Sequence, residues 1–515
     1  MNPTDEPRRP VARLVPGFRD TYSDEVQARR GMFETIRQVY ERYGFVPLET
    51  PAIEFVDVLG KFLPESNTPA AGIFSWKEDT GKDEEGKDRE EWVSLRYDLT
   101  APLSRVVAMG HHFPLPYRRY QVGPVYRREA SLEPGRFQEF YQMDFDSIGV
   151  PGVAADAEAC CIMSETLEAL GINRGQYIVR ANNRKVLGAL IEKIGIGAKG
   201  QETAWSEKAL TVLRAIDKLD RIGLDGVVDL LGIGRKDPSG SFTPGAGLYE
   251  TQVEQVRSFL EVSSTSRLDY CRSLEKMLSG SKSGEEGVRE MVEIDEFLRK
   301  AGVDEDRVTF DTTVVRGLAY YTGPIFEATL TMEITDSDGV RRRFGSVFGG
   351  GRYDYLVERF TGQRIPATGA SVGVDRLLSA LKLLGRVTVG SSTAPVIVIA
   401  LNSKNLSEYH TLAASLRSAG INTEVYMGGD GLAGQMRYAD DTGKVVAVLR
   451  GDREKAAGTV SIKDLRRGKE LSAEHSNRKS WLEALPGQVT VPEAKLVETV
   501  KDILARYDPA RTSQP

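Results

Sequence analysis

The sequence predicts an α+β fold in which helices flank an antiparallel sheet, followed by a small α/β domain. Two observations indicate the sheet: a hairpin pattern of aromatic and β-branched residues spans 117–149, and strand-like segments return at 308–330 and 341–357. Strands that alternate with helices from residue 394 onward indicate the α/β domain. The chain of 515 residues is also too long for one core, since domains usually hold about 100–200 residues.

We expect the chain to be organised as a divided core, an insertion and a C-terminal domain. Residues 1–194 and 304–386 form the two parts of the core. The segment 195–303 between them is charged, punctuated by glycines and helical in tendency, and it carries no recognisable chemical motif. It is therefore predicted to be an inserted helical domain. A linker rich in Gly, Ser and Thr at 385–395 leads into the α/β domain, residues 394–515.

Each element is predicted from its own pattern. Apolar residues at helical spacing predict a helix over 24–43, and the hairpin is followed by a helix over 155–170, a strand near 176–179 and a helix from residue 184. The charged stretch Lys82–Glu91 (KDEEGKDREE) is expected to be a solvated loop. In the last domain we expect strands at 395–401, 421–427 and 444–450, with helices at 406–419 and 433–441.

Composition and charge exclude several classes of protein. No apolar run approaches the roughly 18 residues that cross a bilayer, and the N-terminus lacks the apolar centre of a secretory signal. Three cysteines without CxxC spacing and four histidines without an HxxxH pair support neither disulfides nor a zinc site. A net charge of −6 argues against sequence-blind nucleic-acid binding but permits local basic patches. We expect a reduced, cytoplasmic protein with no membrane partner and no metal cage.

The second strand of the hairpin carries a face of polar side chains. Alternate residues of a strand project to one side, which here groups Phe140, Gln142, Asp144 and Asp146. Burying an amide and two carboxylates without partners is costly, so this face is expected to line either solvent or a polar pocket. An ordinary antiparallel hairpin with one wet face stays the alternative.

Charged residues also mark the two sides of the hairpin loop. Arg127 and Glu129 end the first strand, and Arg136 precedes the second. Guanidinium groups offer rigid, forked donors to anionic oxygens, so this arrangement suits a polyphosphate.

Further candidate residues lie in the second part of the core. Arg316 is predicted to stand in an apolar strand, followed by Tyr320 and Tyr321, and an unpaired charge there would be expensive. An ion pair with a structural carboxylate is the alternative explanation for Arg316. Glycines at 349–351, which let a backbone approach a ligand closely, precede Tyr353.

The familiar nucleotide-binding loops are absent, since the sequence has no GxxxxGK[ST] and no GxGxxG after a strand. Instead, several segments resemble those of class II aminoacyl-tRNA synthetases. Residues 17–51 resemble motif 1, the hairpin segments YRRE and GRFQEFYQ resemble motif 2, and GASVGVDR (369–376) resembles motif 3. RGLAYYTG (316–323) and GGGRYD (349–354) are similar to the two histidine signatures of the histidyl-tRNA synthetase family.

The resemblance covers residues 14–470 and includes YDLT (97–100) and a C-terminal segment like an anticodon-binding domain. It implies a class II synthetase-like fold and a homodimer. It also implies the use of ATP with Mg²⁺, L-histidine as substrate and tRNA-His as partner, with no tightly bound metal.

The resemblance also implies a role for each candidate residue. The α-ammonium of histidine is expected to contact Asp98, Thr100 and Gln142. The imidazole is expected to contact Asp146 and Tyr321, in a pocket shaped by Tyr320 and Tyr353. For ATP, the expected contacts are Arg127 to the α-phosphate, Arg136 to the terminal phosphates, Glu129 to the adenine amino group, and Phe140 and Arg376 on the two faces of the adenine ring. Arg316 is expected to bridge the substrate carboxylate and the α-phosphate, so that Arg316 and Arg127 are the catalytic residues.

The sequence departs from the family pattern at two places. Ala319 stands where the family usually has Asp, and the motif 2 loop ASLEPGR (130–136) differs from the Arg-Pro-Gln loop common in bacterial members. Two alternatives are weighed: the synthetase-like regulatory subunit of ATP phosphoribosyltransferase, and an RNA-binding module without turnover. The anticodon-like domain and Arg316 argue against the first, and the phosphate-binding arginines against the second.

Overall fold

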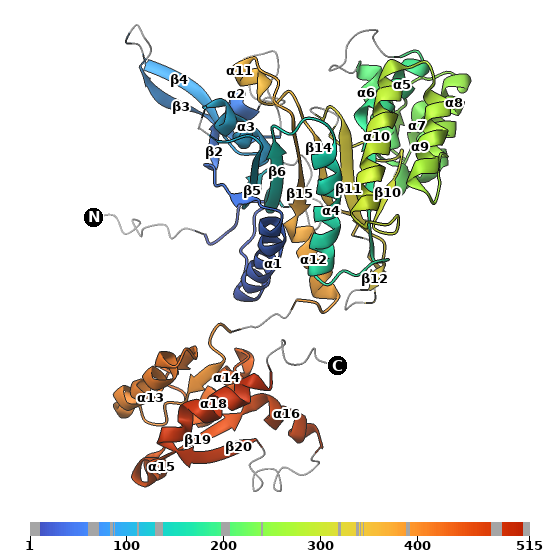
Figure 1. The fold of residues 1–515 in the computed structure, drawn as a ribbon. Helices are drawn as coiled ribbons and strands as arrows, with labels where there is room; N and C mark the ends of the chain where they lie inside the picture. The colour runs from blue at the N-terminus through green and yellow to red at the C-terminus, as the bar shows by residue number, and fades with distance from the viewer. Residues whose placement is uncertain are drawn as a thin grey trace. The chain divides into compact units, whose positions relative to one another are not determined.

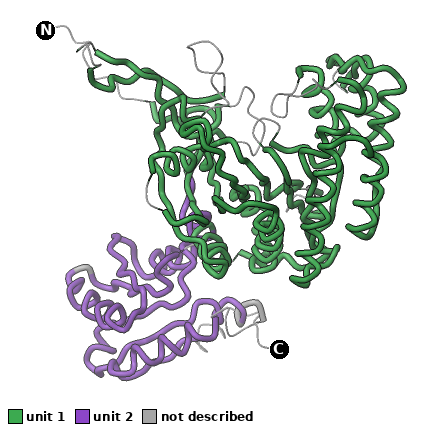
Figure 2. The backbone as a smooth tube through the Cα atoms, turned by 45° about the horizontal axis from the view of Figure 1, so that its top comes forward, with its two compact units in different colours: residues 1–20, 29–387 green, residues 21–28, 388–515 purple. Residues whose placement is uncertain are grey.

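The computed structural model divides the chain into two compact units, one with residues up to Asp20 and Arg29–Val387, the other with Thr21–Ala28 and the residues from Thr388 (Figure 2). The residues that the structure describes are 11–59, 72–82, 86, 88–110, 113–128, 137–196, 206–237, 240–317, 321–335, 339, 341–342, 344–387, 392–474 and 487–507.

An eight-stranded sheet forms the centre of the first unit. Its strand order is β1 (Val46–Pro47), β5 (Tyr117–Tyr126), β6 (Glu139–Ile148), β15 (Ala367–Gly373), β14 (Ser346–Arg352), β11 (Pro324–Leu330), β7 (Tyr177–Asn183) and β10 (Val308–Phe310). All inner pairs are antiparallel, and only the edge strands β1 and β10 pair in parallel. The predicted antiparallel sheet and hairpin are confirmed, and strands from both parts of the core interleave in this one sheet.

Helices α1 (Ser23–Arg42) and α4 (Ala154–Ala169) cover one face of the sheet (Figure 1). α1 buries a helical stripe of apolar residues, and its acidic first turn and Arg42 in the last turn suit the helix dipole. The ring of Tyr40 lies 5.0 Å from that of Phe145, which projects from β6 on this face. The apolar side of the hairpin is therefore buried under α1.

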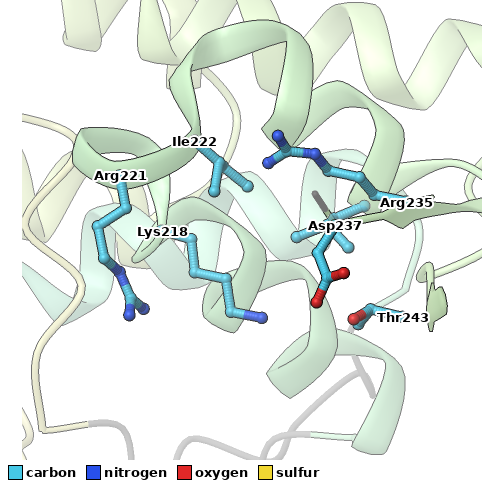
Figure 3. Close-up of a pocket in the computed structure, with 7 residues that line it drawn as sticks. Lys218, Arg221, Ile222, Arg235, Asp237 and Thr243 are labelled. Carbon is cyan, nitrogen blue, oxygen red and sulfur yellow. The ribbon is translucent and has the colours of Figure 1, made fainter. Parts of the chain in front are cut away.

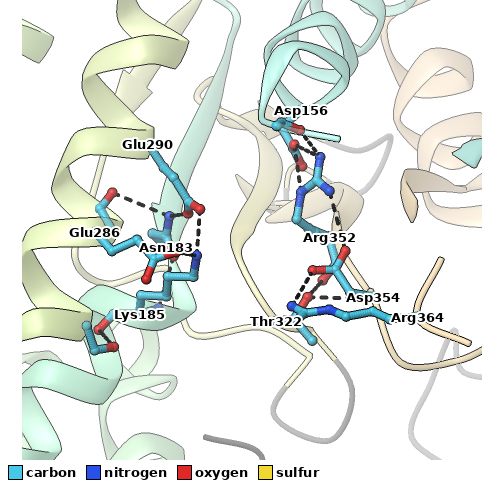
Figure 4. A network of polar contacts seen from close by, with 12 residues as sticks. Asp156, Asn183, Lys185, Glu286, Glu290, Thr322, Arg352, Asp354 and Arg364 are labelled. Carbon is cyan, nitrogen blue, oxygen red and sulfur yellow. Dashed lines mark hydrogen bonds and ion pairs between the residues drawn. The ribbon is translucent and has the colours of Figure 1, made fainter. Parts of the chain in front are cut away.

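A buried ion pair joins α4 to the sheet. Arg352 of β14 projects toward the helices, and its Nε lies 2.9 Å from Oδ2 of Asp156 (Figure 4). Arg352 also pairs with Asp354, which Arg364 contacts from the surface. Arg352, although it belongs to the GGGRYD motif, is thus part of the covered face.

The segment after β7 is mostly helical, as predicted. It contains α5 (Arg184–Lys193), α6 (Glu207–Ile216), α7 (Leu219–Leu231), α8 (Glu250–Leu260), α9 (Arg267–Leu278) and α10 (Lys282–Lys300), with a small ribbon of β8 (Gly234–Lys236) and β9 (Phe242–Pro244). Lys185 on α5 contacts both Glu286 and Glu290 on α10 (Figure 4), and α10 also packs on α4. The last helix of the predicted insertion is therefore packed on the core, and the boundaries at 194 and 303 stay predictions.

A three-stranded sheet lies at the other end of the first unit (Figure 1). Its strands are β2 (Ile53–Phe55), β4 (Asp88–Leu95) and β3 (Ser75–Lys82), and the short helix α2 (Val56–Leu59) follows β2. The prediction of a loop over Lys82–Glu91 is wrong for the described residues, because Lys82 ends β3 and residues 88–91 begin β4. Lys82 and the charged residues 88–90 stay exposed while the backbone pairs, so charge alone did not exclude a strand.

The described residues around Arg316 also form no strand, contrary to the prediction. β10 ends at Phe310 and β11 begins at Pro324, and residues 311–317 between them form turns and irregular backbone. The remaining elements of the second part of the core are short: β12 (Ile334–Thr335), β13 (Arg341–Arg342) and α11 (Glu358–Thr361), before the longer α12 (Val374–Leu383).

The second unit is built on a five-stranded sheet. Its order is β17 (Thr423–Val425), β16 (Val396–Val398), β18 (Val446–Leu449), β19 (Thr459–Asp464) and β20 (Gln488–Pro492). The first three strands are parallel, as predicted, whereas β19 and β20 pair antiparallel. The helices are α13 (Leu406–Ser418), α14 (Leu432–Asp441), α15 (Asp452–Ala457), α16 (Leu465–Glu474) and α18 (Leu496–Ala505), with 3-10 turns at Ser403–Asn405 and Glu493–Lys495.

Candidate functional site

Strand register builds a polar face on the side of the sheet opposite to α1 and α4. In antiparallel pairs, directly opposed residues project to the same side. Asp146 lies opposite Arg119 on β5 and Gly369 on β15, and Asp144 lies opposite Ser371. The predicted alternation of Phe140, Gln142, Asp144 and Asp146 is therefore confirmed. Asp144 and Asp146 are each only 2% exposed, which favours a polar pocket over a wet face.

Asp146 is held by two neighbours. Nη2 of Arg119 lies 2.7 Å from Asp146 Oδ2, and the hydroxyl of Tyr353 donates a hydrogen bond to Oδ1. Burial raises the pKa of Asp146, and the charge of Arg119 and the bond from Tyr353 oppose that rise. Burial also raises the pKa of Tyr353 well above its ordinary value, so its hydroxyl stays a neutral donor.

Several buried polar atoms on this face have no hydrogen-bond partner among the described residues. These atoms are Gln142 Oε1, Asp144 Oδ1, Asp146 Oδ2, and Nε and Nη1 of Arg119. A buried donor or acceptor without a partner costs about 1–3 kcal/mol. A group of both kinds on adjacent strands points to a polar ligand that supplies the missing bonds.

Asp98 adds a third carboxylate to this region. Its Oδ1 accepts a hydrogen bond of 2.9 Å from the backbone N–H of Ala101, at the start of α3 (Thr100–Ala108). Its charge raises the pKa of both Asp144 and Asp146. For Asp144, burial is the larger cause, and the pKa rises to about 7. Three mutually repelling carboxylates suit a cationic ligand group, and half-buried Thr100 and Gln142 stand beside them, with Gln142 donating to Ser371 at 2.8 Å.

Arg316 reaches this side of the sheet from irregular backbone. Its Nε donates to Oε1 of Glu327 on β11, and its Nη2 to Oγ of Ser346, both at 2.6 Å. A Cβ on Gly349 would lie 2.1 Å from Arg316 Nη1, so glycine in the second histidine signature leaves room for the arginine of the first in this position. The side chain is 37% exposed, and it is therefore paired with a carboxylate yet accessible to a ligand.

A close approach of another side chain also explains the glycine that follows Arg316. Gly317 has a φ of +63°, and a Cβ there would lie 1.8 Å from the ring of Tyr321. Tyr321 packs with Tyr353 and Leu103 in one apolar cluster. Glycine at position 317 therefore leaves room for the Tyr321 ring, which packs in the same cluster as Tyr353.

The third part of the face lies where the hairpin meets α12. The guanidinium of Arg127 lies over the ring of Tyr97 at 4.3 Å and that of Phe140 at 5.1 Å. The backbone N–H of Tyr141 donates to Asp375 Oδ2 at 3.0 Å, which brings the first turn of α12 to the Phe140 end of β6. Arg376, in that turn, is exposed and donates to the Ser346 carbonyl at 2.8 Å.

Two family models match the sequence. One, described as histidyl-tRNA synthetase, matches residues 17–377, and one, described as anticodon binding domain, matches residues 395–502. The first covers more than half of the chain. The chain belongs to the histidyl-tRNA synthetase family.

Individual relatives agree with this family. The chain is 47% identical to a histidine–tRNA ligase of Brucella abortus (strain S19) over 97% of both chains, and 48% identical to one of Rhizobium leguminosarum bv. trifolii over 97% of this chain and 96% of the relative. Among solved structures, histidyl-tRNA synthetase from Nostoc sp. PCC 7120 superposes with a TM-score of 0.71 at 28% identity, covering 96% of this chain and all of the other. A Bacillus halodurans protein titled as an ATP phosphoribosyltransferase regulatory subunit/histidyl-tRNA synthetase, at 21% identity and TM-score 0.60 over 86% of this chain and 100% of its own, shares the fold.

The family's sequence motifs did not reveal every residue of the site. Arg119, Ser371 and Glu327 were not predicted, although Arg119 alternates with Gln121 along a strand whose partner carries Asp146. That alternation was the available signal. The predicted residues Glu129, Arg136 and Tyr320 lie outside the described residues, as do Ala319 and the loop 130–136.

Two cavities have linings that include none of the predicted site residues. One of about 250 Å³ lies in the predicted insertion, and its lining includes Lys218, Arg221 and Arg235 together with Asp237 and Thr243 (Figure 3). The other, of about 270 Å³, is lined by α1 and β5. Within the described residues, no helix is both long and apolar enough to cross a membrane.

Proposed function

We propose that this chain is a histidine–tRNA ligase. It joins L-histidine to ATP as histidyl-adenylate with release of pyrophosphate, and it then transfers the histidyl group to the 3′ end of tRNA-His with release of AMP. The observation that carries the proposal is the buried polar face with unpartnered donors and acceptors, in a chain of this family.

The histidine substrate occupies that face. Its α-ammonium binds Asp98, Thr100 and Gln142, where the charge of Asp98 raises the pKa of the neighbouring carboxylates Asp144 and Asp146. A neutral imidazole has one donor and one acceptor nitrogen, so Asp146 and Tyr321 together recognise both. Tyr320 and Tyr353 shape the ring pocket. Recognition through such hydrogen bonds can reject analogues that lack them by roughly 10⁴-fold or more.

ATP binds along the hairpin toward α12. Arg127 contacts the α-phosphate, Arg136 the terminal phosphates and Glu129 the adenine amino group. Phe140 and Arg376 enclose the adenine ring, in keeping with the hydrogen bond that joins the backbone of Tyr141 to Asp375. Mg²⁺ bound with ATP would supply positive charge that compensates the phosphate oxygens.

Adenylate formation needs alignment and charge compensation, and no general base. An oxygen of the histidine carboxylate attacks the α-phosphorus, a P–O bond forms, and the bond to pyrophosphate breaks. Arg316 and Arg127 hold the two reacting groups together and offset the growing negative charge. The pair of Arg316 with Glu327 keeps the guanidinium extended over Gly349 before the substrate arrives.

In the second step a terminal ribose hydroxyl of tRNA attacks the carbonyl carbon of the adenylate, and AMP leaves. The second unit binds the anticodon, and the insertion contacts the acceptor arm, where the cavity with three cationic side chains offers donors to phosphates. The enzyme acts as a homodimer through the motif 1 helix and strand, in the cytoplasm. A regulatory subunit is disfavoured, because the chain keeps an anticodon-binding domain and Arg316.

The test is amino-acid-dependent ATP–pyrophosphate exchange with each of the twenty amino acids, followed by charging of a tRNA-His transcript. We expect exchange with histidine alone. Exchange with none, or with a different amino acid, contradicts the proposal.

A further inference from the structure

The polar face contains a buried arginine whose function the site described above leaves open. Arg119 on β5 has no exposed side-chain surface, and its Nη2 donates to the Leu99 carbonyl at 3.0 Å. Its Nε and Nη1 have no hydrogen-bond partner among the described residues. Burying a guanidinium with so few hydrogen bonds costs free energy of folding. Stability of the fold therefore does not explain why an arginine stands here. Its closest charged neighbour is Asp146.

The carboxylate of Asp146 is constrained on three sides. Arg119 lies 2.7 Å from Oδ2, and Tyr353 donates to Oδ1. A Cβ on Gly369 would lie 2.3 Å from Oδ1, so the opposite strand leaves no room for any larger residue there. Oδ1 is thus occupied by Tyr353, whereas Oδ2 lies beside the Arg119 guanidinium but receives no hydrogen bond of good geometry among the described residues. Oδ2 is the oxygen left for a ligand.

We propose that Arg119 is a positioning residue for substrate selection, which keeps Asp146 charged and leaves its Oδ2 as the acceptor for a ring N–H of bound histidine. The proposal rests on the proposed function, which assigns the imidazole to Asp146. A charged carboxylate only accepts hydrogen bonds, whereas a protonated one would present a donor to the ring N–H. Burial and the charge of Asp98 both raise the pKa of Asp146, and the charge of Arg119 is the strongest influence that lowers it.

A purely structural ion pair predicts something different. Loss of Arg119 would then lower stability and change the apparent affinity for every substrate, or for none. If Arg119 acts through Asp146, its loss raises the KM for histidine selectively, and the effect disappears once Asp146 no longer carries a charge.

The experiment is a double-mutant cycle in ATP–pyrophosphate exchange with the full-length chain. We expect Arg119→Met and Asp146→Asn each to raise the histidine KM at least about 10-fold, the loss of roughly one charged hydrogen bond, with the ATP KM changed less than about 3-fold. Arg119→Lys, which retains the charge, should restore most of the histidine affinity. In the Asp146→Asn background, Arg119→Met should add less than about 3-fold, because the two residues act as one unit.

The matched control is Arg118→Met. Arg118 is the adjacent arginine of β5, and it projects to the helix side, where it pairs with Glu158. We expect its loss to lower thermal stability without changing the histidine KM.

The outcomes separate the two proposals. An unchanged histidine KM in Asp146→Asn contradicts the ring assignment and overturns both. A raised KM in Asp146→Asn, with no change in Arg119→Met or with effects that multiply in the double variant, overturns only the role of Arg119. If Arg119→Met does not fold, the double variant retains a neutral pair. A histidine KM equal to that of Asp146→Asn then supports the proposal, and a much larger one contradicts it.

Discussion

A single methyl group would disrupt the contact that Arg316 makes with the sheet. Because a Cβ at position 349 would lie 2.1 Å from Arg316 Nη1, we expect Gly349→Ala to displace the guanidinium. A misplacement of about 1 Å can cost on the order of 10²-fold in rate. The variant should therefore lose at least about 10-fold in histidine-dependent exchange while ATP still binds. Exchange at the wild-type rate would show that the guanidinium position is not limiting.

Removing the same side chain altogether tests its catalytic role. We expect Arg316→Ala to lower adenylation at least about 10²-fold, the loss typical of one preorganised electrostatic group, with a much smaller change in ATP affinity. Arg174→Ala, which breaks an exposed ion pair with Asp304, is the control and should stay within about 2-fold. Near-normal exchange in Arg316→Ala would show that Arg316 serves only as the structural partner of Glu327.

Asp144 predicts how stability depends on pH. Its pKa in the folded protein is raised from 3.8 to about 7, so the folded state binds its proton more tightly than the unfolded state does. This contribution to stability is complete below pH 3.8 and is lost as pH rises through about 7. Between pH 5 and pH 8, the fall in the unfolding temperature of the substrate-free protein should be smaller in Asp144→Asn than in the wild type. Equal falls in the two proteins would contradict the assignment.

At the scale of elements, a buried ion pair between Asp156 and Arg352 joins α4 to β14. Asp156→Ala leaves Arg352 buried without its main partner, and we expect a loss of about 3–5 kcal/mol in unfolding free energy. Arg364→Ala removes an arginine that is 55% exposed from the same network, so it should cost less than about 1 kcal/mol. Urea unfolding, followed by a signal of the first unit, measures both. Similar losses in the two variants would contradict this ranking.

Hydrophobic periodicity predicted the secondary structure more reliably than charge did. Alternation along 139–148 and helical spacing in α1 correctly predicted structure, because apolar side chains gather on one face of each element. Charge misled over residues 88–91, which pair in β4 although the side chains of 88–90 are exposed and that of Glu91 is half-buried. Arg316 was placed in a strand because its neighbours are apolar, yet Val314 and Val315 are buried in irregular backbone. Burial and strand pairing are separate properties, and hydrophobicity reports only burial.

At the scale of the whole molecule, the loop between Glu129 and Arg136 predicts how tRNA is chosen. Leu132 and Pro134 offer no side-chain hydrogen bonds and Glu133 repels phosphates, so we expect no requirement for the added 5′ guanosine. A discriminating base contact is typically worth about 1–3 kcal/mol, which kinetics can resolve. The measurement is kcat/KM for two tRNA-His transcripts, with and without that nucleotide. A preference above about 10²-fold for the longer transcript would contradict the prediction.

The sequence by itself determined the family, the division into a sheet-based core and an α/β domain, and the face of β6 that carries Gln142, Asp144 and Asp146. These features depend on local periodicity and on motifs that lie within one segment. Only the tertiary structure placed Arg119 against Asp146, Glu327 against Arg316, and Gly349 beneath that arginine. Such contacts join strands far apart in the chain, and strand register, which one segment alone does not specify, decides which side chains meet.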